Sequence, residues 1–252
     1  MSLLVADNIA VSFGGVKAVQ DVSFAVELGE VFSIVGPNGA GKTTIFNLIS
    51  RIYDVDHGSI VFDGLDITRV PTHAIAERGI ARTFQNTELF ERETVLQNLL
   101  IGCHIHRKSN LFSELFFLPS VKRQELELRR VVEDVIDLLD LQSYRDNTIG
   151  ELPFGVRKMV EVARALCLRP KLLLLDEPSS GLNPEETEDL SFWLEDINEE
   201  LGITVIMVEH DMNLVTQASD RILAMADGRT ITIGEPQAVQ SHPEVLRAYL
   251  GD

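Results

Sequence analysis

The sequence contains a glycine-rich segment whose residue types fit the binding of a triphosphate. The segment reads Gly36-Pro37-Asn38-Gly39-Ala40-Gly41-Lys42-Thr43, with Thr44 next, and matches the pattern GxxxxGK[ST]. Its glycines let backbone N–H groups curl around an anion, and a helix that starts after them points its positive end at the same phosphates. Lys42 would bring positive charge to the β- and γ-phosphates, and the Thr43 hydroxyl can bind Mg²⁺. Because the segment follows the apolar run Val31–Val35, we predict a nucleotide site rather than an ordinary glycine-rich turn.

A second segment supplies two adjacent carboxylates. Leu172–Leu175 is an apolar run typical of a buried strand, and Asp176, Glu177 and Pro178 follow it. Because α/β sheets bind ligands at the carboxyl ends of their strands, we expect Asp176 to hold Mg²⁺, mainly through its water. Glu177 would then polarise the attacking water as a general base. An acidic turn after a core strand is the alternative, and the phosphate loop upstream favours the catalytic interpretation.

The elements that would position these residues alternate between strands and helices. Apolar runs or period-two patterns predict strands over Leu3–Val11, Val22–Leu28, Val31–Val35, Ser59–Phe62, Ile80–Phe84, Lys171–Asp176, Ile203–Val208, Ile222–Ala226 and Thr230–Ile233. Helical patterns cover Thr43–Ile52, Val121–Leu141, Glu185–Leu201 and Asn213–Ser219. Strands that alternate with helices imply a mostly parallel sheet covered on both faces.

Residues 93 to 168 carry almost no strand pattern, so we predict a helical subdomain inserted into an α/β core. The core would comprise residues 1–92 and 169–252, with a helical tail over about 235–252. The predicted fold is therefore a single α/β domain. It has a P-loop NTPase core with a mostly parallel sheet, an antiparallel β region near the N-terminus and an inserted α-helical subdomain.

Composition limits the classes of partner. The chain has 252 residues and a formal net charge of −17 at pH 7. Because a nucleic-acid-binding surface needs positive charge, this acidity argues against DNA or RNA as a partner. Cys103 and Cys167 form no disulfide framework, and the sequence has neither a secretory signal nor an apolar stretch of about 20 residues. We expect a cytoplasmic protein that reaches a membrane only through a partner.

Three further segments make the sequence resemble the ABC ATPase family. Gln85 ends the run Ala81–Gln85, His210 follows the strand at Val205–Val208, and Ser179–Asn183 follows the two carboxylates. These segments occur in the family's order, and the resemblance covers nearly the whole chain. It implies that ATP and Mg²⁺ are the cofactors and that the glycine-rich loop, residues 36 to 44, binds ATP. Ser179–Asn183 would cross the interface between two ATPase subunits.

The resemblance also implies individual roles. Gln85 would contact Mg²⁺ and sense the membrane partner, His210 would contact the γ-phosphate, and Phe13 would stack on adenine. The residues that it assigns to catalysis are Glu177, His210, Lys42 and Gln85, and those that it assigns to the metal are Thr43, Gln85 and Asp176. Taken alone, Gln85 would be a surface residue, His210 a structural or capping residue and Phe13 a core residue, so these roles depend on the context.

One motif departs from the family. Its signature, Leu-Ser-Gly-Gly-Gln, is replaced by Leu152-Pro153-Phe154-Gly155-Val156 before a predicted helix over Arg157–Leu168. In the family this motif binds the ATP of the partner subunit, and Pro153 has no side-chain donor to replace the serine hydroxyl. Backbone N–H groups at a helix N-terminus would remain. We therefore hypothesise an unequal pair, in which the site built on this chain's Lys42 and Glu177 does more of the hydrolysis if the partner is a different subunit.

Within the family, the resemblance is closest to the ATPases of branched-chain amino acid importers. It rests on Ala81–Gln85, Ser180–Glu185, the insertion Cys103–Lys122 and the tail Gly234–Asp252. The implied partners are a second ABC ATPase subunit, identical or different, two transmembrane permease subunits and, indirectly, a periplasmic or extracellular solute-binding protein. The chain would lie on the inner face of the cell membrane and energise the uptake of branched-chain amino acids or a related small solute.

Other interpretations stay open. Lipopolysaccharide-export ATPases share much of the tail, and a regulatory module that binds ATP and hydrolyses it weakly would fit the altered signature. An ABC ATPase that acts on DNA or ribosomes is a further class. The acidity of the chain argues against that class, as does the absence of a second ATPase domain or a long coiled-coil pattern.

Overall fold

The computed structural model describes residues 1–83, 89–106 and 119–250. The chain forms two compact units, and the first combines Met1–Gln85 with Lys171–Asp252. We call it the α/β unit. The second, the helical unit, lies within Asn86–Pro170. Gln85 and Phe84 lie outside the described residues.

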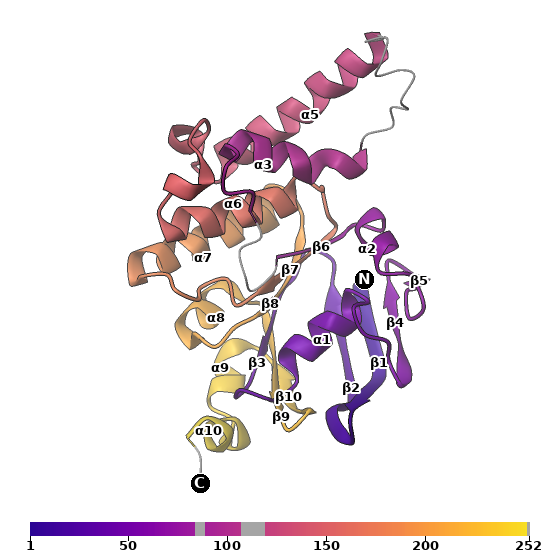
Figure 1. Cartoon of the computed structure of the whole chain (residues 1–252). Coiled ribbons are helices and arrows are strands. Elements are labelled where there is room, and N and C mark those ends of the chain that lie inside the picture. Colours follow the sequence, from indigo (N-terminus) through magenta and orange to yellow (C-terminus); the bar gives the residue numbers. More distant parts are fainter. Residues whose placement is uncertain (84–88, 107–118, 251–252) are drawn as a thin grey trace. The chain divides into compact units, whose positions relative to one another are not determined.

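The described part of the α/β unit contains two sheets (Figure 1). An antiparallel sheet has the order β2-β1-β4-β5 and comprises β1 (Ser2–Phe13), β2 (Val16–Glu27), β4 (His57–Phe62) and β5 (Leu65–Asp66). The second sheet has the order β10-β9-β3-β8-β7-β6 and comprises β3 (Val31–Val35), β6 (Ile80–Arg82), β7 (Leu172–Asp176), β8 (Thr204–Val208), β9 (Arg221–Ala226) and β10 (Arg229–Gly234). Its strands are parallel except for the β9–β10 hairpin. The predicted α/β fold, with an antiparallel region and a mostly parallel sheet, is confirmed.

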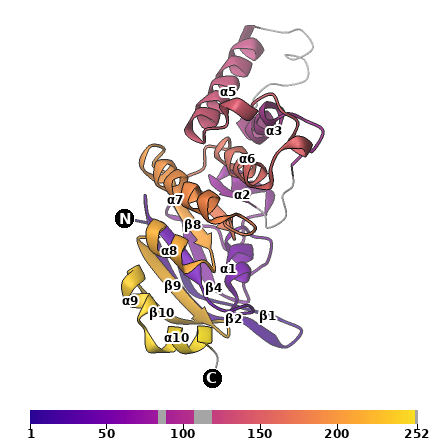
Figure 2. The same ribbon diagram turned by 90° about the vertical axis from the view of Figure 1, so that its left-hand side faces the viewer.

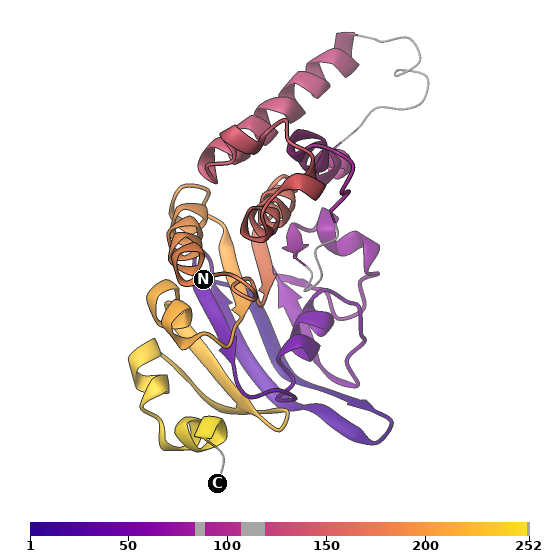
Figure 3. The same cartoon turned by 60° about the vertical axis from the view of Figure 1, so that its left-hand side comes forward.

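Both faces of the central strands of the second sheet, β3, β7 and β8, are buried. Alternate residues on one face share a core with α1 (Lys42–Ile49) and the antiparallel sheet, namely Phe32, Ile34, Leu172, Leu174, Ile206, Val208, Leu223 and Met225. On the other side lie α7 (Pro184–Glu199), α8 (Met212–Ala218) and α9 (Pro236–Gln240), in orange to yellow (Figures 2 and 3). The Ser33 hydroxyl, which belongs to this second face, lies 2.6 Å from that of Ser219, directly after α8. The unit also contains α2 (His73–Glu77) and α10 (Pro243–Leu250).

The helical unit is built from α3 (Val95–Gly102), α5 (Pro119–Leu138) and α6 (Phe154–Leu166), with short 3-10 turns at Cys103–His106, Gln142–Tyr144 and Ile149–Glu151. Its core is apolar and includes Val95, Leu99, Val132, Ile136, Val160 and Ala163. No described helix of either unit combines the length and the apolar character that crossing a membrane requires.

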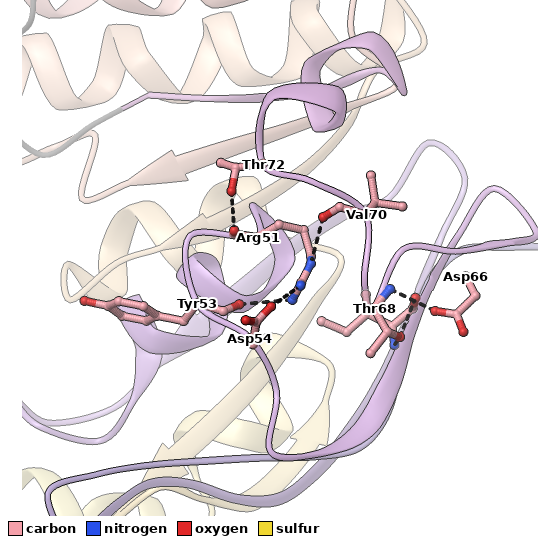
Figure 4. A network of polar contacts seen from close by, with 8 residues as sticks. Arg51, Tyr53, Asp54, Asp66, Thr68, Val70 and Thr72 are labelled. Atoms are coloured by element: carbon pink, nitrogen blue, oxygen red, sulfur yellow. Dashed lines mark hydrogen bonds and ion pairs between the residues drawn. The ribbon is translucent and has the colours of Figure 1, made fainter.

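The helix after the phosphate loop ends earlier than the sequence predicts. We expected it to reach Ile52, but α1 ends at Ile49 and Arg51 has a φ of 60°, which is incompatible with a continuing right-handed helix. The Arg51 guanidinium is buried and donates to the carbonyls of Val70 (3.2 Å) and Tyr53 (3.1 Å), and it pairs with Asp54 (Figure 4). These contacts stabilise the turn that the chain makes at Arg51 after α1.

We expect Arg51→Met to lower the free energy of unfolding by about 1–3 kcal/mol, because two partly buried carbonyls lose their charged donor. The exposed Arg69 is the matched control, and Arg69→Met should change stability by less than about 0.5 kcal/mol. Urea unfolding of the two full-length variants measures the difference. Equal losses would show that the Arg51 contacts contribute nothing.

Candidate functional site

Three strands of the parallel sheet end at the same level. Ile34 of β3 pairs with Val208 of β8, and Val208 pairs in turn with Asp176, the last residue of β7. The phosphate loop continues from β3, Glu177 from β7 and His210 from the end of β8. The structure therefore brings the predicted loop, carboxylates and histidine to one edge of the sheet, the edge at which α/β folds bind ligands.

Two glycines of the loop are required by close backbone packing. Gly36 has a φ of 153°, and a Cβ there would lie 2.3 Å from the Met225 carbonyl oxygen. Gly41 has a φ of 97°, and its Cβ would lie 2.4 Å from the Ala18 carbonyl oxygen. Any side chain at these positions would push the loop off β9 or β2. The loop thus owes its shape to strands that are distant in sequence.

Lys42 is held inside the loop. Its ammonium group donates to the carbonyls of Gly36 (2.7 Å) and Pro37 (3.2 Å), and the residue is only 6% exposed. Burial lowers the pKa of Lys42, and the negative charges of Glu177 and Asp176 oppose that shift. The cation therefore lies among carbonyl and carboxylate oxygens, where a bound phosphate could reach it.

A pocket of about 630 Å³ opens over the loop. It is lined by Val16, Lys17, Ala18, Gln20, Asn38, Gly39, Ala40, Gly41, Lys42, Thr43, Thr44, Glu177 and Asp227. Lys17, Gln20 and Asp227 were not expected from the sequence. The Gln20 side chain donates to the Asp227 carbonyl (2.8 Å), and the Gly228 N–H donates to the Ala40 carbonyl (3.1 Å), so the β9–β10 turn is tied to both β2 and the loop.

Phe13, expected to stack on adenine, lies at the end of β1 beside this region but is not among the residues that line the pocket. Its ring is 42% exposed and meets the Tyr53 ring edge-on, with centroids 4.9 Å apart. Val16 and Lys17, which follow Phe13 in the β1–β2 hairpin, line the pocket. The predicted stacking on adenine stays a prediction.

Asp176, expected to hold Mg²⁺, has a cationic neighbour that the sequence did not reveal. Its Oδ2 accepts from Arg82 of β6 at 2.8 Å, and both side chains are buried. Arg82 also donates to the side chains of Asn47 (2.7 Å) and Ser50 (2.9 Å) and lies over the Phe46 ring. The arginine thus links the carboxylate at the end of β7 to the helix that follows the phosphate loop.

Glu177 and His210 follow neighbouring strands. The Glu177 N–H donates to the Val208 carbonyl at 2.9 Å, with a φ of 49° that turns the chain sharply after β7. The His210 side chain is 58% exposed, and its predicted contact with the γ-phosphate stays a prediction. Gln85 lies outside the described residues, so its predicted contact with Mg²⁺ stays a prediction. No group of three described His, Cys, Asp or Glu side chains forms a metal cluster.

The signature segment belongs to the helical unit. We expected its helix to begin at Arg157, but α6 begins at Phe154, because Pro153 takes the N-cap position (φ −54°, ψ 153°). Phe154, Gly155 and Val156 therefore form the first turn, where backbone N–H groups lack partners within the helix. Pro153 supplies no side-chain cap. The segment keeps the backbone donors of a helix start and lacks the hydroxyl.

The C-terminal helix reaches the first glycine of the loop. Burial raises the pKa of Tyr249 in α10, and an interaction with the Gly36 backbone opposes that shift. Val239 of α9 and Val245 of α10 are buried. The tail packs against the β9–β10 hairpin.

Comparison with known proteins identifies the family. Residues 19–180 match the family model described as ABC transporter. The chain belongs to the ABC transporter ATPase family. Residues 229–252 match a second model, described as branched-chain amino acid ATP-binding cassette transporter. The C-terminal segment of the chain is thus similar to that of the branched-chain amino acid transporters.

Curated relatives of this ABC cassette span its full length. BraF, a high-affinity branched-chain amino acid transport ATP-binding protein of Pseudomonas aeruginosa, is 38% identical over 99% of this chain and 98% of its own. LivG of Escherichia coli K12, with the same description, is 36% identical with the same coverage. LptB, the lipopolysaccharide export system ATP-binding protein of Haemophilus influenzae, is 34% identical over 100% and 98% of the two chains.

A solved structure agrees with the fold. The crystal structure of the ADP conformation of an ATP-binding cassette from an ABC transporter superimposes with a TM-score of 0.87. The two chains are 34% identical, and the match covers 100% of each. The part of the chain that the structure describes therefore has the ABC ATPase fold.

We expect Gly41→Ala to weaken ATP binding more than Gly39→Ala does. Both glycines have a positive φ, so each alanine carries a strain of about 1–2 kcal/mol. Only the Gly41 variant also drives its Cβ against the Ala18 carbonyl, whereas a Cβ at Gly39 meets nothing within 4 Å. Titration with a fluorescent ATP analogue should give an affinity at least about tenfold lower for Gly41→Ala. Equal affinities would contradict the packing argument.

Proposed function

We propose that the chain is the ATP-binding and ATP-hydrolysing subunit of an importer for branched-chain amino acids or a related small solute. The observation that carries this proposal is the match of residues 229–252 to the branched-chain amino acid model, on a chain whose pocket is built around a phosphate loop. Export of lipopolysaccharide, the activity in the name of LptB, has less support because LptB is 34% identical to this chain, against 38% for BraF and 36% for LivG.

ATP would lie in the pocket over the loop. Its phosphates would accept hydrogen bonds from the loop N–H groups of residues 36 to 44 and from the Lys42 ammonium. The adenine would lie toward Phe13, whose half-exposed ring offers an apolar surface. Lys42 would exchange its two carbonyl partners for the β- and γ-phosphate oxygens.

The donor set at the strand ends fits Mg²⁺. Thr43 offers a hydroxyl and Asp176 a carboxylate, both hard oxygen donors, and Gln85 is expected to add an amide oxygen. Mg²⁺ prefers such sites, with one or two carboxylates, water and the phosphates of the substrate. When bound, it neutralises charge on the phosphates. Arg82 would orient the Asp176 carboxylate through their ion pair.

Glu177 and His210 would promote the attack of water on the γ-phosphate. Glu177 lies at the pocket wall, where its carboxylate can take a proton from the attacking water. The imidazole of His210 would donate to a γ-phosphate oxygen and hold it in line with that water. Because phosphoryl transfer needs positioning and charge stabilisation more than covalent help, these groups and Lys42 account for the chemistry.

The proposed partners follow from the same branch of the family. A second ABC ATPase subunit, identical or different, would complete each nucleotide site with its own signature segment. Two transmembrane permease subunits would hold the pair at the inner face of the cell membrane, and an extracytoplasmic solute-binding protein would deliver the solute. Nucleic acid has no place in this scheme, given a net charge of −17.

Two substitutions separate binding from hydrolysis. Lys42→Ala should weaken ATP binding by about 10-fold to 100-fold, the value of a charge-assisted hydrogen bond. Glu177→Gln should retain ATP affinity but lower phosphate release by about 100-fold to 10,000-fold, because it removes the general base. Glu185→Gln, at an acid in the first turn of α7, is the control and should change neither. Unchanged affinity and turnover in Lys42→Ala would overturn the proposed function.

The unequal-pair hypothesis can be tested in a complex with a different partner subunit. Glu177→Gln in this chain should reduce ATP turnover more than the matching change in the partner, because the partner's site is completed by the segment that contains Pro153. Pro153→Ser should narrow the gap, since serine is a favoured N-cap residue and restores a hydroxyl. Steady-state phosphate release measures both effects. Equal losses in the two Glu→Gln complexes would remove the hypothesis.

A further inference from the structure

A buried carboxylate lies behind the proposed catalytic histidine. Glu209, the residue after β8, has 0% exposure. Burying a carboxylate is costly unless hydrogen bonds compensate, so its partners indicate why it is there. Its own N–H donates to the Ile34 carbonyl at 3.3 Å, which fixes its backbone at the end of β3.

The two carboxylate oxygens bind different segments. Oε1 accepts from the Ser179 N–H at 2.8 Å, on the segment that follows Glu177. Oε2 accepts from the N–H groups of His210 (2.9 Å) and Asp211 (3.3 Å). Oε2 also lies 3.8 Å from Nδ1 of the His210 ring. One side chain therefore joins the segment that carries the general base to the segment that carries the histidine.

This arrangement needs a carboxylate in particular. An ionised carboxylate is an acceptor at both oxygens, whereas an amide replaces one oxygen by a group that only donates. Glutamine at this position would have to release either Ser179 or the two N–H groups at His210 and Asp211. The local negative charge would also vanish from beside the imidazole ring.

We propose that Glu209 is a positioning residue for ATP hydrolysis, which sets His210 in register with the Glu177–Ser179 segment. The inference rests on the proposed function, in which His210 contacts the γ-phosphate. Glu209 is buried behind the two segments and acts through the histidine and the backbone. Its loss should therefore slow the chemical step and leave ATP binding intact, because the phosphate loop and Lys42 are untouched.

Glu30 offers a matched control. It is also a buried carboxylate of the α/β unit, 6% exposed, and it accepts from the Glu27 N–H (2.6 Å) and from Arg221 (3.1 Å). It precedes β3 at the end opposite the phosphate loop. Glu30→Gln thus removes a buried charge of the same kind without touching the site.

The experiment measures steady-state MgATP hydrolysis by the full-length chain in its transport complex, with ATP affinity taken from a fluorescent analogue. Glu209→Gln should lower kcat by about 10-fold to 100-fold, as seen when carboxylates that orient metal-bound histidines are removed, with KM and affinity unchanged. Glu30→Gln should lower the Tm and leave kcat unchanged. If both variants lower kcat equally, or if Glu209→Gln loses affinity in proportion to kcat, the inference is wrong.

A double-mutant cycle separates this inference from the proposed function. In a His210→Ala background, Glu209→Gln should cost less than about a further twofold, because the two residues act as one unit. If Glu209→Gln lowers kcat by the same factor in the wild-type and His210→Ala backgrounds, Glu209 is not a positioning residue. The proposed role of His210 would still stand. If His210→Ala alone leaves turnover unchanged, the proposed role of His210 fails and the inference fails with it.

A second variant serves if Glu209→Gln does not fold. Glu209→Asp withdraws the carboxylate by one methylene and should show the same loss of kcat at constant affinity.

Discussion

Parallel strands exchange evenly spaced hydrogen bonds, so their register decides which residues emerge together at the end of a sheet. In this chain Ile34, Val208 and Asp176 share one level across β3, β8 and β7. A slip of one residue would turn each strand's buried side chains to the opposite face, at a large cost in a sheet covered on both sides. The packing of the core thus enforces the positions at which the loop, the carboxylates and the histidine leave the sheet.

The charged groups at this edge are held by local partners before any ligand binds. Asp176 lies against Arg82, Lys42 against loop carbonyls, and Glu209 against backbone N–H groups. Such pairing is what permits charges to be buried at all. It also means that these side chains are oriented before ATP binds. ATP must compete with the Gly36 and Pro37 carbonyls for the Lys42 ammonium.

Short-range patterns predicted the fold class and the segments that carry chemistry, because loop glycines, apolar strands and carboxylates are local in sequence. The finer structure depends on residues far apart. Arg82 meets Asp176 across 94 positions, and Gln20 meets the Asp227 carbonyl across 207. No local pattern marks such partners. The end of α1 was misplaced for a related reason, since the reversal at Arg51 is stabilised by Val70, 19 positions away. The start of α6 was misplaced although its cause is local, because Pro153 takes the N-cap position.

The net charge bears on how such a site can attract its ligand. A chain with a formal charge of −17 repels a triphosphate at long range. At physiological ionic strength that repulsion is screened beyond about 8 Å, so the approach is opposed only near the surface. The net charge therefore gives ATP no long-range attraction to this chain. The gain must come at contact, from Lys42, from N–H groups oriented by the loop and from the first turn of α1. The tight glycine contacts at Ala18 and Met225 matter because they fix those N–H groups.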